Sequence, residues 1–302
     1  MMAGFQTDFL YSQRTGDTGA GCKKPLHRAP RALECILMAM RFCILGSGSS
    51  GNCALLQTDA TRVLVDAGFS TRRLGELLAV HGESLSRIDA VFLTHEHGDH
   101  ATGLGGLAKF PHIKIFANAA TSRAVQAGLK HRPAWQLFET GTRFSFRDLE
   151  IESFAVPHDA HEPVGFLFSH GEGSLLSPRR ALAWLTDLGH APQHVHERIR
   201  EADVLVVEAN YCPELLKADQ KRPWSTKQRI SGRHGHLSND RARELLESVA
   251  SPRWRRIYLA HLSRDCNSTA AIEKTFAAVR VALGCTFSIV APGGGTPFDD
   301  FS

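Results

Sequence analysis

The sequence lacks the features of a secreted or membrane protein. None of its apolar runs reaches the roughly 20 residues that a membrane helix needs, and its start has no basic segment followed by an apolar one. Its seven cysteines are odd in number and include no Cys-x-x-Cys pair, so neither a set of disulfides nor a cysteine zinc site is indicated. These absences predict a cytoplasmic protein without a membrane partner.

A large excess of charge of one sign is also missing. The formal net charge is +4 and the isoelectric point is near 8.7. This mildly basic balance tolerates an anionic partner such as nucleic acid without requiring one. Hydrophobic residues make up 43% of the 302 residues, which is ample for a large core.

Residues 1–39 have no sustained hydrophobic period and mix glycine, proline, arginine and lysine. We expect them to form a poorly ordered extension. Met38 or Met40 could be the true translation start, because the first convincing strand begins at Arg41. The folded domain is therefore predicted to span residues 40–302.

The most informative stretch is residues 94–100, which directly follows the apolar run 90–93. Three imidazoles and two carboxylates fall within these seven residues, and His95, His97, Asp99 and His100 are the candidate ligands. Imidazole and carboxylate together suit zinc, manganese or iron rather than calcium. The apolar run predicts a buried strand, and residues 99–109 are predicted as a helix after the turn.

Other polar residues repeat this placement at the ends of apolar strands. In two cases, Asp66 and Asp187, a glycine lies two residues after the acid. The residues concerned are Asp66, His158, Asp187, Glu208 and His261. Sheet-based enzymes gather their sites at such an edge, so we expect these residues to meet. His161, three residues after His158, is an alternative ligand.

The motif His95-x-His97-x-Asp99-His100 resembles the signature of the metallo-β-lactamase fold of binuclear metallohydrolases. The resemblance implies an α/β protein built as an αββα four-layer sandwich, with two mixed β-sheets flanked by helices. It also implies two divalent metal ions, zinc or manganese, and a supporting role for Asp66. The implied ligands are His95, His97 and His158 for one ion, Asp99, His100 and His261 for the other, and Asp187 as the bridge.

A loop at residues 233–239 indicates the chemistry. Together with Glu208, Gly235-His236-Leu237-Ser238 resembles the arrangement of ribonuclease Z, in which a histidine protonates the leaving oxygen and a glutamate orients it. A phosphodiester releases a poor leaving group, so general acid catalysis worth ~10²–10⁴-fold is expected in a nuclease. The predicted catalytic residues are Asp99, His236 and Glu208. One residue is extra inside the motif, and Ser238 or Asn239 is expected to cap the helix that follows.

The sequence also resembles one branch of this fold, the YycJ/WalJ-type hydrolases, over about residues 41–295. The similar segments are 46–52, 158–165, 234–239 and 261–263. The resemblance implies a cytoplasmic bacterial nuclease, with 5′-exonuclease activity on DNA as the expected function. A glyoxalase II-like thioesterase and a small-molecule cyclic phosphodiesterase are the alternatives, and DNA is a more natural partner than RNA.

Two further segments have two interpretations each. The Gly/Ser loop at residues 46–52 lacks a Walker lysine and leads to a strand, so it is either a phosphate-contacting rim or a turn. The basic run from Lys217 to Arg233, with Trp224 inside it, is either a strip that follows a nucleic-acid backbone or a solvated loop.

Overall fold

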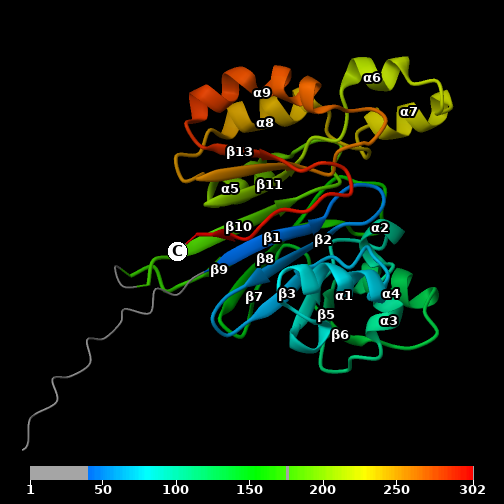
Figure 1. Ribbon diagram of the computed structural model, residues 1–302, viewed down its shortest axis with the longest axis vertical. Coiled ribbons are helices and arrows are strands. Elements are labelled where there is room, and N and C mark those ends of the chain that lie inside the picture. The colour runs from blue at the N-terminus through cyan, green and yellow to red at the C-terminus, as the bar shows by residue number, and fades with distance from the viewer. Residues whose placement is uncertain (1–39, 175–176, 302) are drawn as a thin grey trace, which may run out of the picture. The chain divides into compact units, whose positions relative to one another are not determined.

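Two β-sheets lie face to face between layers of helices in the computed structural model (Figure 1). The structure describes residues 40–174 and 177–301. The predicted N-terminal extension, residues 1–39, lies outside the described residues. In the described part of the chain the predicted αββα sandwich is confirmed.

The first sheet has seven strands in the order β14-β1-β2-β3-β4-β5-β6. β1, β2 and β3 form an antiparallel meander, and β3 to β6 run parallel. The strands are β1 (Arg41–Gly46), β2 (Cys53–Gln57), β3 (Arg62–Val65), β4 (Ala90–Phe92), β5 (Lys114–Ala117), β6 (Ala134–Leu137) and β14 (Asp299–Asp300).

The second sheet also has seven strands, in the order β13-β12-β11-β10-β9-β8-β7. β10 to β13 run parallel, and β7 to β10 are antiparallel. The strands are β7 (Arg143–Phe146), β8 (Leu149–Ala155), β9 (Val164–His170), β10 (Arg180–Leu185), β11 (Val204–Glu208), β12 (Arg256–Ala260) and β13 (Thr286–Ile289).

Helices cover the outer face of each sheet. Those on the first sheet are α1 (Thr71–Val80), the 3₁₀ helix η1 (Leu85–Arg87), α2 (Gly98–Ala101), α3 (Leu104–Leu107) and α4 (Ala119–Ala127). Those that follow β10 are α5 (Gln193–Arg200), α6 (Pro213–Ala218), α7 (Trp224–Ser231), α8 (Asn239–Val249) and α9 (Thr269–Leu283). Among residues 40–174 and 177–301, every helix is too short or too polar to cross a lipid bilayer.

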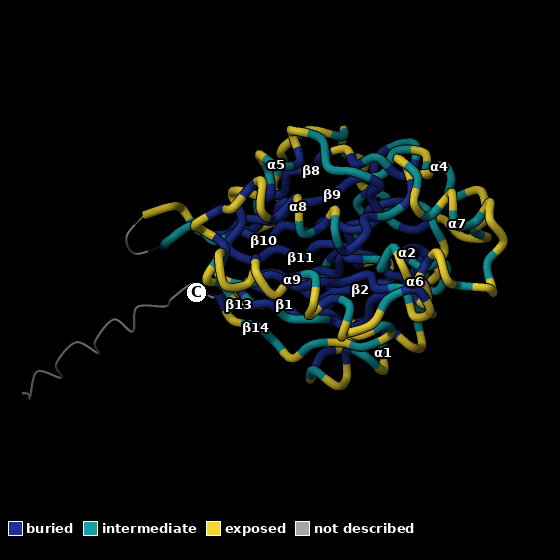
Figure 2. Tube along the Cα trace, turned by 90° about the horizontal axis from the view of Figure 1, so that it is seen from above, coloured by how far each residue is buried: buried dark blue, intermediate teal, exposed yellow. Residues whose placement is uncertain are grey.

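The central strands are apolar at nearly every position because both of their faces are covered (Figure 2). Between the sheets, Phe42 packs against Trp184 and Phe92 packs against Phe166. Outside the first sheet, Leu74 and Leu78 of α1 lie one turn apart and are fully buried. Three apolar layers therefore hold the sandwich together and fix where the strand ends lie.

The segment after the metal motif differs from the single predicted helix over residues 99–109. It forms two short helices, α2 and α3, which meet at Gly103. The Gly103 N–H donates to the carbonyl of Ala67 at 2.8 Å, and a Cβ at Gly103 would lie 2.5 Å from the carbonyl oxygen of Phe69. The helix is interrupted because its backbone packs directly against the turn after β3.

Candidate metal centre

The predicted site residues meet where strands of both sheets end. β3 and β4 are parallel in the first sheet, and β8, β10, β11 and β12 share one direction in the second. The residues at these ends are Asp66 after β3, His95 after β4, His158 after β8, Asp187 after β10, Glu208 at the end of β11 and His261 after β12. The sandwich thus brings residues that are distant in sequence to one edge.

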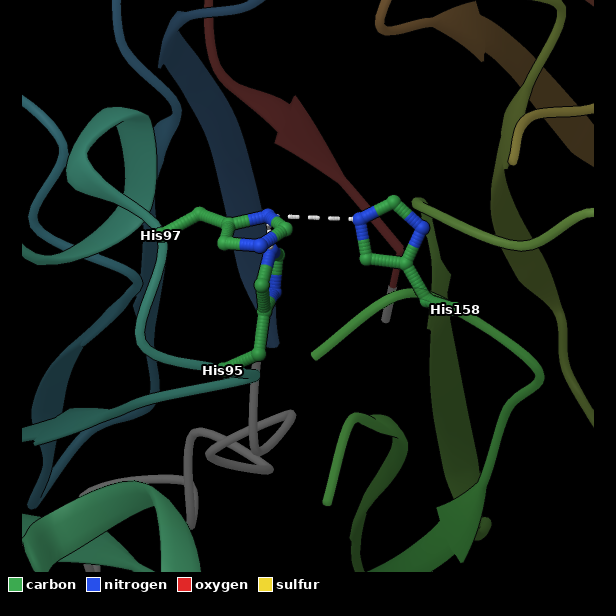
Figure 3. A group of neighbouring side chains, drawn as sticks. All are labelled: His95, His97 and His158. Atoms are coloured by element: carbon green, nitrogen blue, oxygen red, sulfur yellow. Dashed lines mark hydrogen bonds between the residues drawn. The ribbon is translucent and has the colours of Figure 1, made fainter. Parts of the chain in front are cut away.

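His95, His97 and His158 form a first group (Figure 3). One ring nitrogen from each lies within 4.8 Å of the other two. His97 Nδ1 is 3.0 Å from His95 Nε2 and 3.3 Å from His158 Nε2. The other nitrogen of His158, Nδ1, lies 3.0 Å from the backbone oxygen of Gly235, which sets the orientation of the ring. Such a group could hold one metal ion.

Asp99, His100 and His261 form a second group, with Asp187 beside it. Asp99 Oδ2 is 3.6 Å from His100 Nε2 and 3.7 Å from His261 Nε2. Asp187 contacts both groups, because its Oδ2 lies 3.3 Å from His100 Nε2 and its Oδ1 lies 3.8 Å from His158 Nε2. Its carboxylate therefore lies beside a histidine of each group.

The electrostatics of the cluster favour a cation. Asp187 Oδ2 and His261 Nε2 are buried and have no well-oriented hydrogen-bond partner among the described residues. Burial lowers the pKa of His261, but the carboxylates of Asp187, Asp99 and Glu208 outweigh burial and raise that pKa to about 10. A field that holds a proton on an imidazole also attracts a metal ion, which competes with the proton for the same nitrogen. The residues present thus fit a divalent metal.

In the first group, the surroundings lower the pKa of two histidines instead of raising it. Burial and the neighbouring imidazole of His100 lower the pKa of His95 well below its ordinary value. Burial likewise lowers the pKa of His158. Both rings are therefore neutral near pH 7, and neutral imidazole is the form that donates a lone pair to a metal.

Three residues of the site have a left-handed backbone. The φ angles are +61° at Asp66, +60° at Asp187 and +52° at His261, and each residue comes directly after a strand or closely follows one. Such a conformation costs a non-glycine residue about 1–3 kcal/mol and persists only where the surroundings enforce it. The N–H of His261 donates to Ser47 Oγ at 2.8 Å, and that of Asp187 donates to Glu208 Oε2 at 3.3 Å. These bonds hold the turns that aim the side chains at the cluster.

A second layer of polar groups orients His100. Its Nδ1 lies 2.8 Å from Asp66 Oδ2, and Asp66 Oδ1 accepts a hydrogen bond from the Thr94 N–H at 2.8 Å. Asn52 Nδ2 lies 3.1 Å from His100 Nε2 and 3.3 Å from Asp99 Oδ2. Asp66 has the supporting position expected of it. Asn52 and Thr94 were not predicted as site residues. The only sequence signal at Asn52 is its place at the end of the Gly/Ser loop, and the only one at Thr94 is its place at the start of the metal motif.

Glu208 joins His236 to this cluster. The fully buried carboxylate has its Oε2 2.9 Å from His236 Nδ1 and 2.6 Å from His261 Nδ1, and its Oε1 accepts the Leu237 N–H at 2.7 Å. Burial opposes charge on His236, but the carboxylate of Glu208 raises its pKa above the ordinary value. Because Glu208 occupies Nδ1, Nε2 is on the far side of the ring, and the ring lines the cavity at the metal cluster. The geometry suits proton donation from Nε2.

The extra residue in this loop is accommodated inside the protein. Leu237 is buried in the core under α8. Ser238 is the N-cap of α8, and its Oγ accepts the Arg241 N–H at 3.2 Å. The capping role predicted for Ser238 is thus observed, and its hydroxyl is committed to the helix.

The cavity over the cluster has a volume of about 230 Å³. Its lining includes His236, His158 and Asp187, together with Ser49, Arg222 and Arg229. A cavity of this size whose lining includes guanidinium and imidazole groups can admit a phosphate group.

The basic run from Lys217 to Arg233 is more ordered than a solvated loop, and its cations are less free than those of an open strip along a nucleic acid. It contains the end of α6 and all of α7, and its cations pair with carboxylates: Arg222 with Asp219 and Asp265, Lys221 with Asp265, and Arg229 with Asp159. Trp224, at the start of α7, is 69% exposed. The segment forms a wall of the cavity, and much of its charge is neutralised within the protein.

The other histidines of the motif regions lie away from the metal groups. His161 is exposed, and its Nδ1 is 2.6 Å from Glu96 Oε1. His194 and His196 of α5 are directed at backbone oxygens, of Ala155 and Ala191. His158, and not His161, is therefore the histidine that lies beside His97.

Comparison with known proteins agrees with this geometry. Residues 61–262 match the model of the beta-lactamase superfamily domain. Exodeoxyribonuclease YycJ of Bacillus anthracis is 35% identical over 76% of this chain and 85% of its own length. Exodeoxyribonuclease WalJ of Streptococcus pneumoniae is 33% identical over 87% of this chain and 98% of its own length. The chain belongs to the beta-lactamase superfamily, in the family of YycJ and WalJ.

The resemblance predicted from the sequence is thus confirmed for this member of the beta-lactamase superfamily. Its fold also matches that of the metallo-β-lactamase fold protein YhfI from Bacillus subtilis, with a TM-score of 0.63 and 16% sequence identity. That match covers 87% of this chain and 100% of YhfI. The likeness extends over both sheets and supports the four-layer architecture.

Proposed function

We propose that this protein is a two-metal phosphodiesterase that removes nucleotides from the 5′ end of DNA. The observation that carries the proposal is the His236–Glu208 pair. Glu208 lies within hydrogen-bond distance of His261 in the candidate metal cluster, and His236 lines the cavity beside that cluster. The family contains proteins named exodeoxyribonucleases, which supports DNA as the substrate. The 5′ polarity is the expectation that the sequence motifs of this branch imply, and the names of these relatives do not specify it.

In this proposal His95, His97 and His158 would hold one ion, Asp99, His100 and His261 would hold the other, and Asp187 would be shared between them. Zinc and manganese both suit these donors. Two divalent cations in such a cluster supply a water of lowered pKa and offset the charge that develops on the attacked phosphorus.

The chain's own residues perform the proton transfers. The pKa of Asp99 lies well below its usual range: burial raises it, but hydrogen bonds from His100 and His261 outweigh burial. Asp99 is therefore ionised and accepts the proton of the attacking water. His236 donates the proton at Nε2 to the leaving 3′ oxygen, while Glu208 holds the proton at Nδ1 and stabilises the charged ring.

The two alternative functions, thioesterase and cyclic phosphodiesterase, account for fewer features of this site. A glyoxalase II-like thioesterase releases a thiolate, which is a good leaving group and has no need of the His236–Glu208 pair. A cyclic phosphodiesterase would need the acid but would take a substrate with a single phosphate. Substrate length therefore separates it from a nuclease.

The proposed compartment is the cytoplasm. The described cysteines form no disulfide with one another, which suits a reducing environment. They are Cys43, Cys53, Cys212, Cys266 and Cys285.

End-labelled DNA and RNA, single- and double-stranded, with zinc or manganese, test the proposal. We expect DNA carrying a 5′ label to release labelled mononucleotide first, and elemental analysis to find two ions per chain. Asp187→Ala should remove activity and lower the metal content. Release of a 3′ label first, or turnover of a small thioester without cleavage of any nucleic acid, would overturn the proposed function, and an Asp187→Ala protein that retains both ions would rule out the bridge.

A further inference from the structure

A second groove adjoins the catalytic cavity on the side of the Gly/Ser loop. Its volume is about 400 Å³, and it runs between that loop, the start of α1 and α2. Ser49 and Asp99 line both the groove and the cavity, whereas His158 and His236 line only the cavity. The two hollows are therefore adjacent, and the proposed acid His236 does not line the groove.

The lining of the groove offers hydrogen-bond donors. The hydroxyls of Ser49 and Ser50 make no hydrogen bond within residues 40–174 and 177–301, and Ser70 Oγ only accepts one, from the Arg73 N–H at 3.3 Å. Arg73 also lines the groove; its Nη1 pairs with Glu76 at 3.1 Å, so the rest of the guanidinium is open to a ligand. Free hydroxyls beside a guanidinium suit an anion whose oxygens only accept, which describes a phosphodiester.

A second arginine approaches the Gly/Ser loop from the opposite side. A Cβ built on Gly293 would lie 3.8 Å from both Arg264 Nη2 and Ser50 Oγ, so the guanidinium and the hydroxyl flank the same space. Arg264 is exposed and has no carboxylate within ion-pair distance in the part of the chain that the structure describes. Arg264 therefore supplies a positive charge beside Ser50 that no described carboxylate pairs with, in addition to Arg73 on the groove wall.

We propose that this groove is a second phosphate subsite, which binds the backbone phosphate next to the scissile one. The proposal rests on the proposed nuclease function and names the part of the substrate that this wall recognises. The leaving nucleotide lies at the His236 end of the cavity. The groove at the Asp99 end therefore receives the strand that keeps the scissile phosphate. Because it binds a second phosphate, it makes the enzyme selective for substrates with more than one phosphate.

Arg73→Ala tests the proposal, with Arg72→Ala as its matched control. Arg72 is the preceding residue of α1, pairs with the same Glu76 at 3.0 Å and does not line the groove. Binding of a fluorescent, phosphorothioate-linked single-stranded DNA 12-mer, which resists cleavage, to the metal-loaded protein is measured by anisotropy at several salt concentrations. Arg73→Ala should weaken binding about tenfold and reduce the slope of log K against log salt by about 0.7. Arg72→Ala should change neither.

Turnover gives the second measurement. Bis(p-nitrophenyl) phosphate has a single phosphorus and cannot occupy both subsites. Arg73→Ala should therefore raise KM for the ordinary phosphodiester 12-mer far more than KM for this diester. Equal effects of Arg73→Ala and Arg72→Ala on the 12-mer, while the unmodified protein cleaves DNA, would reject the subsite alone. An unmodified protein that neither binds nor cleaves DNA would reject the proposed function and the subsite with it.

Discussion

His236 and His234 lie two residues apart in one loop but have different surroundings. His236 is half-buried against Glu208, whereas His234 is exposed. We expect His236→Ala to lower turnover on DNA by ~10²-fold or more, because the leaving oxygen then departs without a proton. A p-nitrophenyl phosphodiester should lose much less, since its phenolate needs no proton. His234→Ala is the matched control and should retain full turnover.

Steady-state rates on both substrates provide the comparison. Glu208→Gln should show the same discrimination more weakly, because it alters only the support of the imidazole. If His236→Ala loses the same factor on DNA and on the p-nitrophenyl diester, the acid role is wrong and His236 instead binds the phosphate or maintains the loop.

Among single residues, the sequence best predicted the position of those side chains that follow an apolar strand. Each predicted ligand follows an apolar strand, and the parallel strands bring those ends together. The metal roles themselves stay predictions. Asn52 had no such pattern, because its contact with His100 depends on how the loop after β1 packs against α2.

At the scale of elements, the turn after β3 is joined to the metal loop by backbone contacts. Gly68 N–H donates to the Asn52 carbonyl at 2.9 Å, and Asn52 N–H donates to the Asp99 carbonyl at 2.7 Å. A Cβ at Gly68 would lie 1.8 Å from the Asp99 carbonyl oxygen. There is thus no room for any side chain larger than hydrogen at Gly68.

Gly68→Ala should therefore destabilise the protein by about 1–3 kcal/mol or more and reduce its metal content by displacing Asp99. Gly75→Ala is the control within α1, where a Cβ would meet nothing within 4 Å. It should raise stability by about 0.5–1 kcal/mol, because alanine favours the helix. Thermal unfolding and elemental analysis measure both effects. A Gly68→Ala protein with unchanged melting temperature and metal content would contradict this account of the junction.

The same close packing explains why one predicted helix was wrong. The spacing of apolar residues over 99–109 is helical, but it carries no information about the chain that packs against Gly103. The ion pairs of the basic run were not visible in the sequence for a related reason. Its arginines look free in the sequence because the carboxylates that neutralise Arg222 and Arg229 include Asp265 and Asp159, which are 43 and 70 residues away.

At the scale of the whole molecule, the proposed metal ligands come from both sheets. His95, His97, Asp99 and His100 follow the first sheet, and His158, Asp187 and His261 follow the second. Bound metal would therefore link the two halves of the sandwich and stabilise the folded state, which alone presents the assembled site.

Chelation should lower the melting temperature by about 10 °C, as expected when a ligand present at roughly a thousand times its Kd is removed. Differential scanning calorimetry with and without chelator gives the shift, and re-addition of zinc or manganese should restore the transition. Asp187→Ala should show a much smaller shift. A melting temperature that is the same with and without chelator would mean that the cluster binds no metal in solution.

At Asp187, a substitution that relieves the left-handed backbone would also abolish activity. Glycine would relax the φ of +60° at this position and remove a buried carboxylate, yet it would also remove the bridge between the two groups. An engineering campaign that screens only for heat resistance in the absence of metal would accept such a replacement and accumulate well-folded, inert proteins. Any stabilisation of this scaffold must therefore be selected jointly with turnover, and the turns after β3, β10 and β12 should be excluded from mutagenesis.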